Sequence, residues 1–258
     1  MSGPLVSVLM PTKNRPEWLP FALRCYAEQD YPDRELLVLD DGAGHPVDEA
    51  AVAAVGGRVV RFGMSLALGA KLDAGVAEAR GAILAKMDDD DWFAPGYLRA
   101  HVEALVALPA GVATPVVVGC SRYPHLFIRR WESFELRHPY VSGNFCFSRA
   151  LHTQVPFPHI IGQGTDTAFF RAAIAAGHEL VQIDGRGLLV MLRRDGLPGA
   201  SPHTFLQDRN QPVEQAITAR KRPLATPPET LLPAWAVAYL AAMRDPLASD
   251  TSAGSSAR

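Results

Sequence analysis

The sequence predicts an α/β fold, in which a single domain is built on a mostly parallel central sheet with helices on both faces. Over the first 110 residues, short apolar runs of strand length alternate with segments whose apolar residues recur at helical spacing. The apolar runs are rich in β-branched residues, which is typical of strands buried on both faces. No internal repeat or linker divides the chain. This alternation favours parallel strands joined by crossover helices.

The first half of the chain supplies most of the predicted elements. Strands are expected at residues 5–10, 35–41, 58–62 and 82–87, and helices at 16–29, 66–80 and 95–108. Asn14 is expected to cap the first helix, with Pro16 in its first turn and Pro20 bending it slightly. Gly81 is expected to stop the second helix.

The second half is less regular. Residues 112–120 and 142–149 are predicted strands, 125–136 is ambiguous between strand and loop, and 165–177 is a predicted helix followed by a strand at 179–184. The apolar segment 231–243 is too short to span a bilayer and is expected to pack as a helix. Interfacial attachment through that helix stays open.

Composition excludes several classes of protein. The chain has 258 residues, of which 48 % are hydrophobic, and its net charge of −2 provides no basic field for nucleic acid. Its three cysteines, Cys25, Cys120 and Cys146, have no metal-binding spacing and predict free thiols in a reducing compartment. The N-terminus lacks the pattern of a secretory signal, so a cytoplasmic location is expected.

Three polar clusters follow predicted strands. They are "PTKNR" after the first strand, "DDG" (40–42) after the second and "DDDD" (88–91) after the fourth. An acidic run by itself is usually a solvated loop. In an open α/β sheet, however, ligands bind at the carboxyl ends of the strands, so two acidic clusters there predict a functional site.

The four aspartates suit a hard divalent cation. Mg²⁺ or Mn²⁺ takes oxygen ligands, commonly one or two carboxylates completed by substrate phosphates. In an extended segment, Asp88 and Asp90 would face one ligand, while Asp89 and Asp91 would face elsewhere and support the loop. A cation completed by a diphosphate implies a nucleotide substrate. Neither GxxxxGK[ST] nor GxGxxG follows a strand, so neither an NTPase nor a dinucleotide enzyme is supported.

Three sequence blocks carry a specific resemblance. "VSVLMPTKNRPEWLPFALRCYAEQDYPDRELLVLDDGA" resembles the opening of the family 2 glycosyltransferases, which have the GT-A (Rossmann-like) fold. "GAKLDAGVAEARGAILAKMDDDDWFAPGYL" is similar to the block that ends in Asp-x-Asp-Asp, and "GTDTAFFRAAIAAGHEL" is similar to the block that supplies the catalytic base. The blocks occur in the family's order and cover roughly residues 5–195.

The resemblance implies a set of donor-binding residues. Asp41 would accept a hydrogen bond from the nucleobase, Asp88 would lie near the ribose, and Lys71 would touch ribose or phosphate. A solvated helical lysine is an equal alternative for Lys71. The full donor set consists of Pro11, Lys13, Asp41, Lys71, Asp88 and Asp89.

The resemblance also implies the metal ligands and the base. Asp90 would bind the metal, and Asp166 would be the general base, although a carboxylate at a helix N-terminus is also an ordinary structural feature. His203 is a candidate metal ligand, with a surface-loop histidine as the alternative. Arg193 and Arg194 are candidates for neutralising the leaving diphosphate, or an ordinary surface pair.

The chain departs from the family pattern at three positions. Thr165 stands where the family often has Glu, Asp73 where Asn is common, and Ala43 where Ser is usual. None of these changes removes a group that the family's reaction needs.

The resulting hypothesis is an inverting, metal-dependent glycosyltransferase that uses Mn²⁺ or Mg²⁺. The donor would be a UDP-, GDP- or dTDP-linked sugar, and the acceptor a hydroxyl or amine on a small molecule or glycan, with no nucleic acid and only peripheral membrane association. Residues 1–110 would form the nucleotide-sugar half, 111–225 the acceptor half on the same continuous sheet, 226–246 a C-terminal helix and 247–258 a disordered tail. Two alternatives are a sugar-phosphate nucleotidyltransferase and a non-catalytic nucleotide-sugar-binding partner protein.

Overall fold

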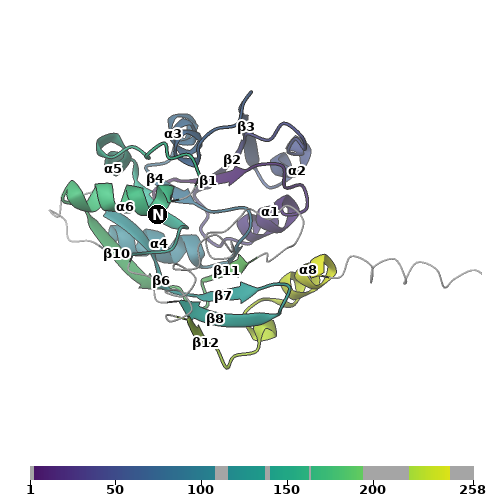
Figure 1. Cartoon of the computed structure of the whole chain (residues 1–258). Coiled ribbons are helices and arrows are strands. Elements are labelled where there is room, and N and C mark those ends of the chain that lie inside the picture. The colour runs from purple at the N-terminus through teal and green to yellow at the C-terminus, as the bar shows by residue number, and fades with distance from the viewer. Residues whose placement is uncertain (1–2, 108–115, 137–139, 163, 194–220, 245–258) are drawn as a thin grey trace, which may run out of the picture.

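A seven-stranded sheet forms the centre of the molecule (Figure 1), and its strand order is β10-β6-β9-β4-β1-β2-β3. The computed structural model describes residues 3–107, 116–136, 140–162, 164–193 and 221–244. All neighbouring strands are parallel except β9, which runs antiparallel to both β4 and β6. The strands are β1 (Val6–Thr12), β2 (Arg34–Asp40), β3 (Gly57–Arg61), β4 (Ile83–Lys86), β6 (Val116–Arg122), β9 (Phe145–Ser148) and β10 (Glu179–Asp184). The mostly parallel central sheet is confirmed.

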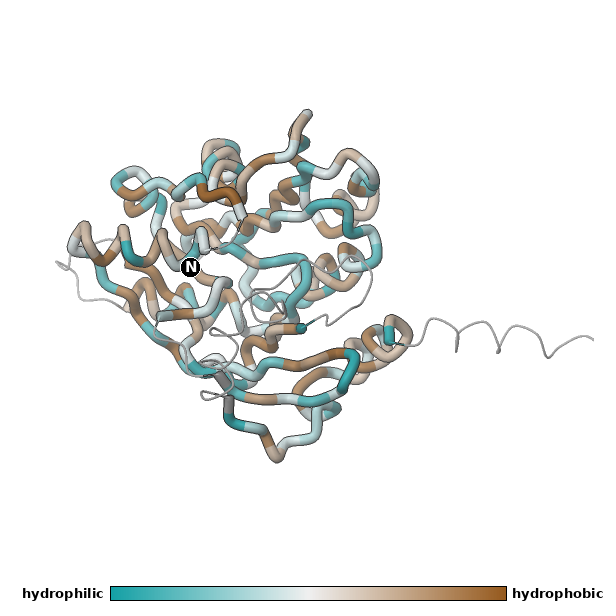
Figure 2. The backbone as a smooth tube through the Cα atoms, viewed as in Figure 1, coloured by the Kyte–Doolittle hydropathy of each residue, from teal (hydrophilic) through white to brown (hydrophobic). Residues whose placement is uncertain are grey.

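Helices cover both faces of this sheet. Strand β1 shows why, because Val6, Val8 and Met10 belong to one buried cluster and Leu9 to the other. The first cluster receives side chains from α1 (Leu19–Ala27), α2 (Glu49–Ala54), α4 (Tyr97–Val106) and α8 (Ala234–Arg244). The second receives them from α3 (Leu68–Glu78), α5 (Arg149–Gln154) and α6 (Thr165–Ala175). Figure 2 shows the hydrophobic residues gathered on strands and helices, with hydrophilic residues in many of the connecting loops.

A second sheet corrects the expectation of one continuous sheet. Its five strands lie in the order β12-β8-β7-β11-β5. They are β5 (Trp92–Phe93), β7 (Pro124–Phe127), β8 (Glu132–Leu136), β11 (Leu189–Arg193) and β12 (Lys221–Pro223). The ambiguous stretch 125–136 is thus an antiparallel hairpin of β7 and β8. Because β11 pairs with β5, directly after the four aspartates, this sheet supports the acidic loop.

The start of the first helix differs from its prediction. Helix α1 begins at Leu19, with Trp18 at the N-cap position and a proline in its first two residues. Asn14 does not cap it; this residue has a positive φ of 51°, and its Oδ1 accepts hydrogen bonds from the backbone N–H groups of Gly44 (3.0 Å) and His45 (3.1 Å). Asn14 therefore joins the loop after β1 to the loop after β2.

The C-terminal segment 231–243 was predicted to pack as a helix, and α8 packs on α1. The ring of Phe21 lies 5.2 Å from that of Trp235 and 5.4 Å from that of Tyr239. Trp235 also donates from Nε1 to Glu28 Oε2 at 3.2 Å. Among the residues that the structure describes, no helix has the length and apolar character needed to cross a membrane. A short 3-10 helix, η2 (Pro228–Thr230), precedes α8.

Candidate active site

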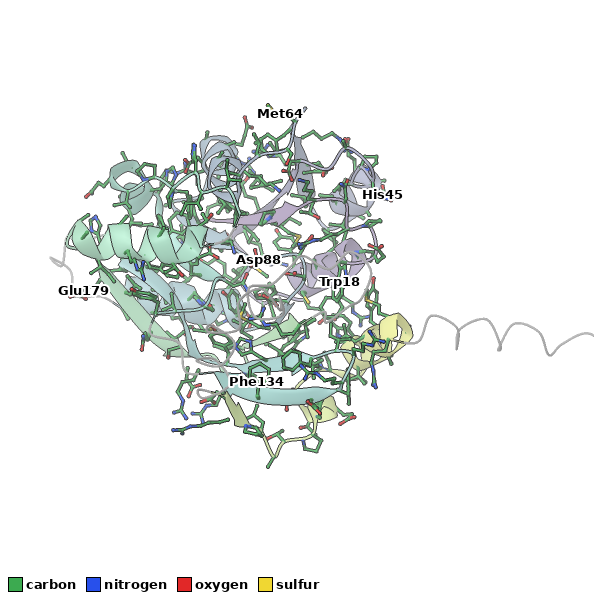
Figure 3. All side chains as sticks on the ribbon, in the orientation of Figure 1. Trp18, His45, Met64, Asp88, Phe134 and Glu179 are labelled. Atoms are coloured by element: carbon green, nitrogen blue, oxygen red, sulfur yellow. The ribbon has the colours of Figure 1, made fainter. Side chains whose placement is uncertain are left out.

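A cleft of about 730 Å³ lies where the carboxyl ends of β1, β2 and β4 meet the N-terminus of α6. It brings together every predicted donor, metal and base residue that the structure describes. These are Pro11, Lys13, Asp41, Lys71, Asp88, Asp89, Asp90 and Asp166. Figure 3 shows Asp88 near the middle of the molecule, between the region of His45 and Met64 and the second sheet with Phe134. His203 and Arg194 lie outside the described residues.

One side of the cleft contains a buried lysine–carboxylate pair. Lys71 Nζ donates to Asp41 Oδ1, and also to the backbone oxygen of Thr12 at 3.0 Å. The other oxygen of Asp41 accepts from the backbone N–H of Leu66 at 2.9 Å. Burial lowers the pKa of Lys71, and Asp41 opposes that shift. The reading of Lys71 as a solvated lysine is wrong, since its side chain is only 7 % exposed.

Arg15 connects the loop after β1 to the acidic loop. Its Nη1 lies 2.5 Å from Asp89 Oδ1 and 3.4 Å from Asp90 Oδ2, and Thr12 Oγ1 donates to Asp89 Oδ2 at 2.6 Å. Asp89 is thus held by two residues of the first loop. The sequence reasoning did not single out Arg15, although it is the arginine of the "PTKNR" motif.

The acidic loop turns instead of staying extended. One carboxylate oxygen from each of Asp88, Asp90 and Asp91 lies within 4.8 Å of the others. The turn at residues 89–91 brings the Asp91 carboxylate close to those of Asp88 and Asp90, but Asp91 is not among the described residues that line the cleft, as the alternation predicts. Asp89, which was expected to face elsewhere, does line the cleft. A cluster of three carboxylates offers the oxygen ligands that a hard divalent cation such as Mn²⁺ or Mg²⁺ prefers.

Lys86 is a second buried lysine, at the end of β4. Its Nζ contacts Asp88 Oδ1 (2.7 Å) and the backbone oxygen of Gly143 (2.7 Å), and it lies 3.5 Å from Asp166 Oδ2. Burial opposes its charge, yet Asp166 and Asp88 together raise the pKa of Lys86 above its ordinary value. The sequence reasoning passed over this residue, although a lysine inside the apolar run "AILAKM" was a signal.

Asp166 lies in the first turn of α6, after Gly164, which has a φ of 100°. Burial and the nearby Asp88 raise the pKa of Asp166 to about 6, against the opposing effect of Lys86. Its Oδ1 makes no hydrogen bond within the described part of the chain. The side chain remains 26 % exposed, so Asp166 is a carboxylate able to take up a proton near neutral pH.

Asp73 occupies the position where the family often has Asn, and it fixes the wall of the cleft. It accepts hydrogen bonds from His152 Nε2 (2.7 Å), His159 Nε2 (2.8 Å) and the backbone N–H of Phe157 (3.0 Å). Although burial opposes the shift, these hydrogen bonds lower the pKa of Asp73. Asp73 thereby ties α3 to the segment that leads into α6.

Arg193 lies in the second sheet rather than in the cleft wall. The residue is buried in β11, where its Nε donates to His125 Nδ1 at 3.2 Å. It is not among the described residues that line the cleft. The reading of Arg193 as half of an ordinary surface pair is wrong, because only 3 % of the residue is exposed.

Comparisons with known proteins agree with this fold. The sequence matches the profile of "Glycosyl transferase family 2" over residues 7–171, well over half of the chain. A search of curated proteins found no match. Among solved structures, the mannosyltransferase PcManGT from Pyrobaculum calidifontis, in complex with GDP-Man and Mn²⁺, is similar with a TM-score of 0.61 and 21 % identity, over 98 % of this chain and 76 % of that one. S. aureus TarS 1-349 with UDP-GlcNAc is similar with a TM-score of 0.55 and 16 % identity, over 84 % of this chain and 66 % of that one.

The fold is the GT-A fold of the glycosyltransferases that the chain resembles in structure. The family profile matches residues 7–171, from the first predicted sequence block into the third. The chain therefore belongs to glycosyl transferase family 2.

Proposed function

We propose that this glycosyltransferase transfers a sugar from a nucleoside-diphosphate donor to an acceptor hydroxyl or amine, with inversion at the anomeric carbon. One observation carries the proposal: Asp88 and Asp90 of the acidic cluster face the same cleft as Asp166, and Lys86 lies between Asp88 and Asp166. A cluster for the diphosphate beside a separate carboxylate is the arrangement that a single displacement requires.

The donor would lie along the ends of β1, β2 and β4. Pro11 and Lys13 line the cleft next to Asp41, and we assign these three residues to the nucleobase. Asp88 and Asp89 would lie beside the ribose and the diphosphate. Asp90, with Asp88, would hold Mn²⁺ or Mg²⁺, which supplies positive charge to the leaving diphosphate when bound.

Asp166 would act on the opposite side of the sugar as the general base. As the acceptor oxygen bonds to the anomeric carbon, Asp166 takes the acceptor proton, and the bond from that carbon to the diphosphate oxygen breaks. Attack from the face opposite the leaving group inverts the centre, by the geometric logic of inverting glycosidases. A pKa of about 6 suits this role, because the carboxylate is ionised at neutral pH but more basic than an ordinary aspartate.

The sugar and the nucleobase stay open among UDP, GDP and dTDP donors. One structural relative was solved with GDP-Man and Mn²⁺ and another with UDP-GlcNAc, so guanine and uracil both remain candidates for the donor base. The three cysteines are free and buried, in keeping with a cytoplasmic enzyme, and peripheral contact with a membrane acceptor is compatible with this location.

A thermal-shift panel tests the proposal. Nucleoside diphosphates are added to the protein with and without Mn²⁺, and a true donor nucleotide should raise the melting temperature by mass action only when the metal is present. Release of the diphosphate from the matching sugar donor then tests turnover. Absence of both effects for UDP, GDP and dTDP would contradict the proposal.

Two alternatives remain distinguishable. A nucleotidyltransferase would form a sugar nucleotide from a nucleoside triphosphate and a sugar phosphate, and it would need a glycine-rich loop after β1, which "MPTKNRPEWL" does not supply. A non-catalytic binding protein would bind the diphosphate without releasing it from a donor. Intact carboxylates at Asp41, Asp88, Asp90 and Asp166 favour the enzyme.

A further inference from the structure

The turn at residues 142–144 contacts both sides of the cleft, although sequence reasoning gave it no role. It leads into β9, the antiparallel strand beside β4. Phe145, at the start of β9, pairs with Lys86, at the end of β4. The turn therefore lies next to the point at which the acidic loop begins.

Asn144 holds the acidic loop at both ends. The residue is fully buried; its Oδ1 accepts from the backbone N–H of Asp88, and its Nδ2 donates to Asp91 Oδ2, both at 2.7 Å. One end of the amide faces a donor and the other a carboxylate, so only one orientation of the amide satisfies both.

Asp91 completes this support. Its Oδ1 accepts from the backbone N–H of Leu192 at 2.8 Å, so both of its oxygens are engaged by the protein. Asp91 links Asn144 to β11 of the second sheet. This leaves Asp88 and Asp90 as the carboxylates of the cluster that face the cleft.

Gly143 contacts the acceptor side of the cleft. Its backbone oxygen accepts from Lys86 Nζ at 2.7 Å, and a Cβ at this position would lie 2.9 Å from Asp166 Oδ2. A side chain at residue 143 would therefore press on the carboxylate oxygen that faces Lys86, and this carboxylate would have to shift.

We propose that the 142–144 turn positions both reacting sides of the cleft, with Asn144 setting the metal-binding loop and Gly143 setting the carboxylate of the base. Both residues act through Asp88, Asp91, Lys86 and Asp166 rather than by contact with the substrate. The inference rests on the proposed function, because it assigns the two sides of the cleft to the diphosphate and to the acceptor.

Asn144→Asp is the sharpest test of the first contact. It keeps the size of the side chain and the oxygen that faces Asp88, but it places a second oxygen against Asp91. Extra negative charge alone would strengthen cation binding, whereas loss of the loop geometry should weaken the binding of Mn²⁺ by about 10- to 100-fold. Mn²⁺ binding is measured by electron paramagnetic resonance, with the nucleoside diphosphate that stabilises the wild type most. Asn144→Ala serves as a second variant without added charge.

Gly143→Ala tests the second contact. The new methyl group would displace Asp166, so diphosphate release from the sugar donor should fall about 100-fold while Mn²⁺ and diphosphate affinity stay within about threefold of wild type. The control is Gly57→Ala. A Cβ at this position would also lie 2.9 Å from neighbouring side chains, but it lies in β3, far from the cleft.

The matched control for the Asn144 variants is Ser7→Ala. This change removes a buried hydrogen bond to Glu35 at the end of β1 that lies away from the cleft.

The outcomes separate the two proposals. A wild-type chain that binds no Mn²⁺–diphosphate overturns the proposed function and this inference with it. A functional wild type with unchanged Mn²⁺ affinity in both Asn144 variants, or unchanged turnover in Gly143→Ala, overturns the inference alone. If Gly57→Ala lowered turnover as much as Gly143→Ala, and Ser7→Ala lowered Mn²⁺ affinity as much as the Asn144 variants, the 142–144 turn would have only a structural role. That result would also overturn the inference.

Discussion

The two sides of the cleft each contain a buried lysine next to an aspartate, but the two pairs differ. On the side that we assign to the donor, Lys71 bonds directly to Asp41, whose second oxygen is also engaged by the protein. On the side that we assign to the acceptor, Lys86 is held by Asp88 and Gly143 and stays 3.5 Å from Asp166, whose Oδ1 has no partner among the described residues.

This difference indicates that Asp41 and Asp166 have different roles. A carboxylate bonded on both oxygens is fixed in place and suits recognition, because its position is set before a ligand arrives. A carboxylate that burial leaves with a pKa of about 6, and one of whose oxygens no described residue bonds, suits proton transfer. Lys86 offsets part of the negative charge of Asp166 and Asp88, but it does not bond to Oδ1 of Asp166.

The largest expected effect comes from Asp166→Asn. The amide cannot accept the acceptor proton, so turnover should fall by about 10²- to 10⁴-fold. Steady-state kinetics with the sugar donor measure this loss. A variant that keeps more than a tenth of the wild-type turnover would exclude Asp166 as the base.

Lys86→Met should give the largest loss of stability. It leaves Asp88 and Asp166 facing each other without the cation between them, and breaking such a buried pair costs about 3 kcal/mol. Urea unfolding measures the difference. As a control, Arg58→Met breaks the exposed pair with Glu78 and should cost less than about 1 kcal/mol. Similar values for the two variants would argue against Lys86 as a buried cation that balances the cleft.

Lys71→Met should act on donor binding rather than on the chemical step. Loss of the charged hydrogen bond to Asp41 should weaken donor affinity by about tenfold, with turnover at saturating donor changed by less than about threefold. A separate determination of KM and kcat distinguishes the two effects. If Lys71→Met lowered only kcat, Lys71 would act on the chemical step, and the proposed difference between Lys71 and Lys86 would be wrong.

The pH dependence of turnover sharpens the same contrast. Asp166 must be ionised to accept a proton, so a raised pKa of about 6 predicts that kcat/KM falls about tenfold per unit as the pH drops below 6 and levels off above it. Donor affinity measured over the same range is the control. An acid limb near 4, the ordinary value for aspartate, would show that burial does not tune this group.

Much of the fold and cleft could be predicted because the signals are local. Buried strands have continuous apolar runs, and polar residues such as Asp41 and Asp88 follow directly at their carboxyl ends. Asp166 was found through a sequence block rather than by physical reasoning, since a helix-terminal aspartate is common in any protein.

The remaining features depend on contacts between distant segments. Strands β7 and β8 are short, and they acquire their place only by pairing with β11 and β12. Helix α2 has six residues, too few for a clear helical period, and it went unpredicted. Asn144 bonds to residues more than 50 positions away, so nothing in "SGNFCFSR" indicates its role.

Calorimetric titration of the stabilising nucleoside diphosphate with Mn²⁺, compared in wild type, Asp166→Asn and Asp41→Asn, tests the division of the cleft most directly. Asp166→Asn should bind within about threefold of wild type, and Asp41→Asn at least about tenfold more weakly. An equal loss of affinity in both variants would contradict the assignment of one side to the donor and the other to the base.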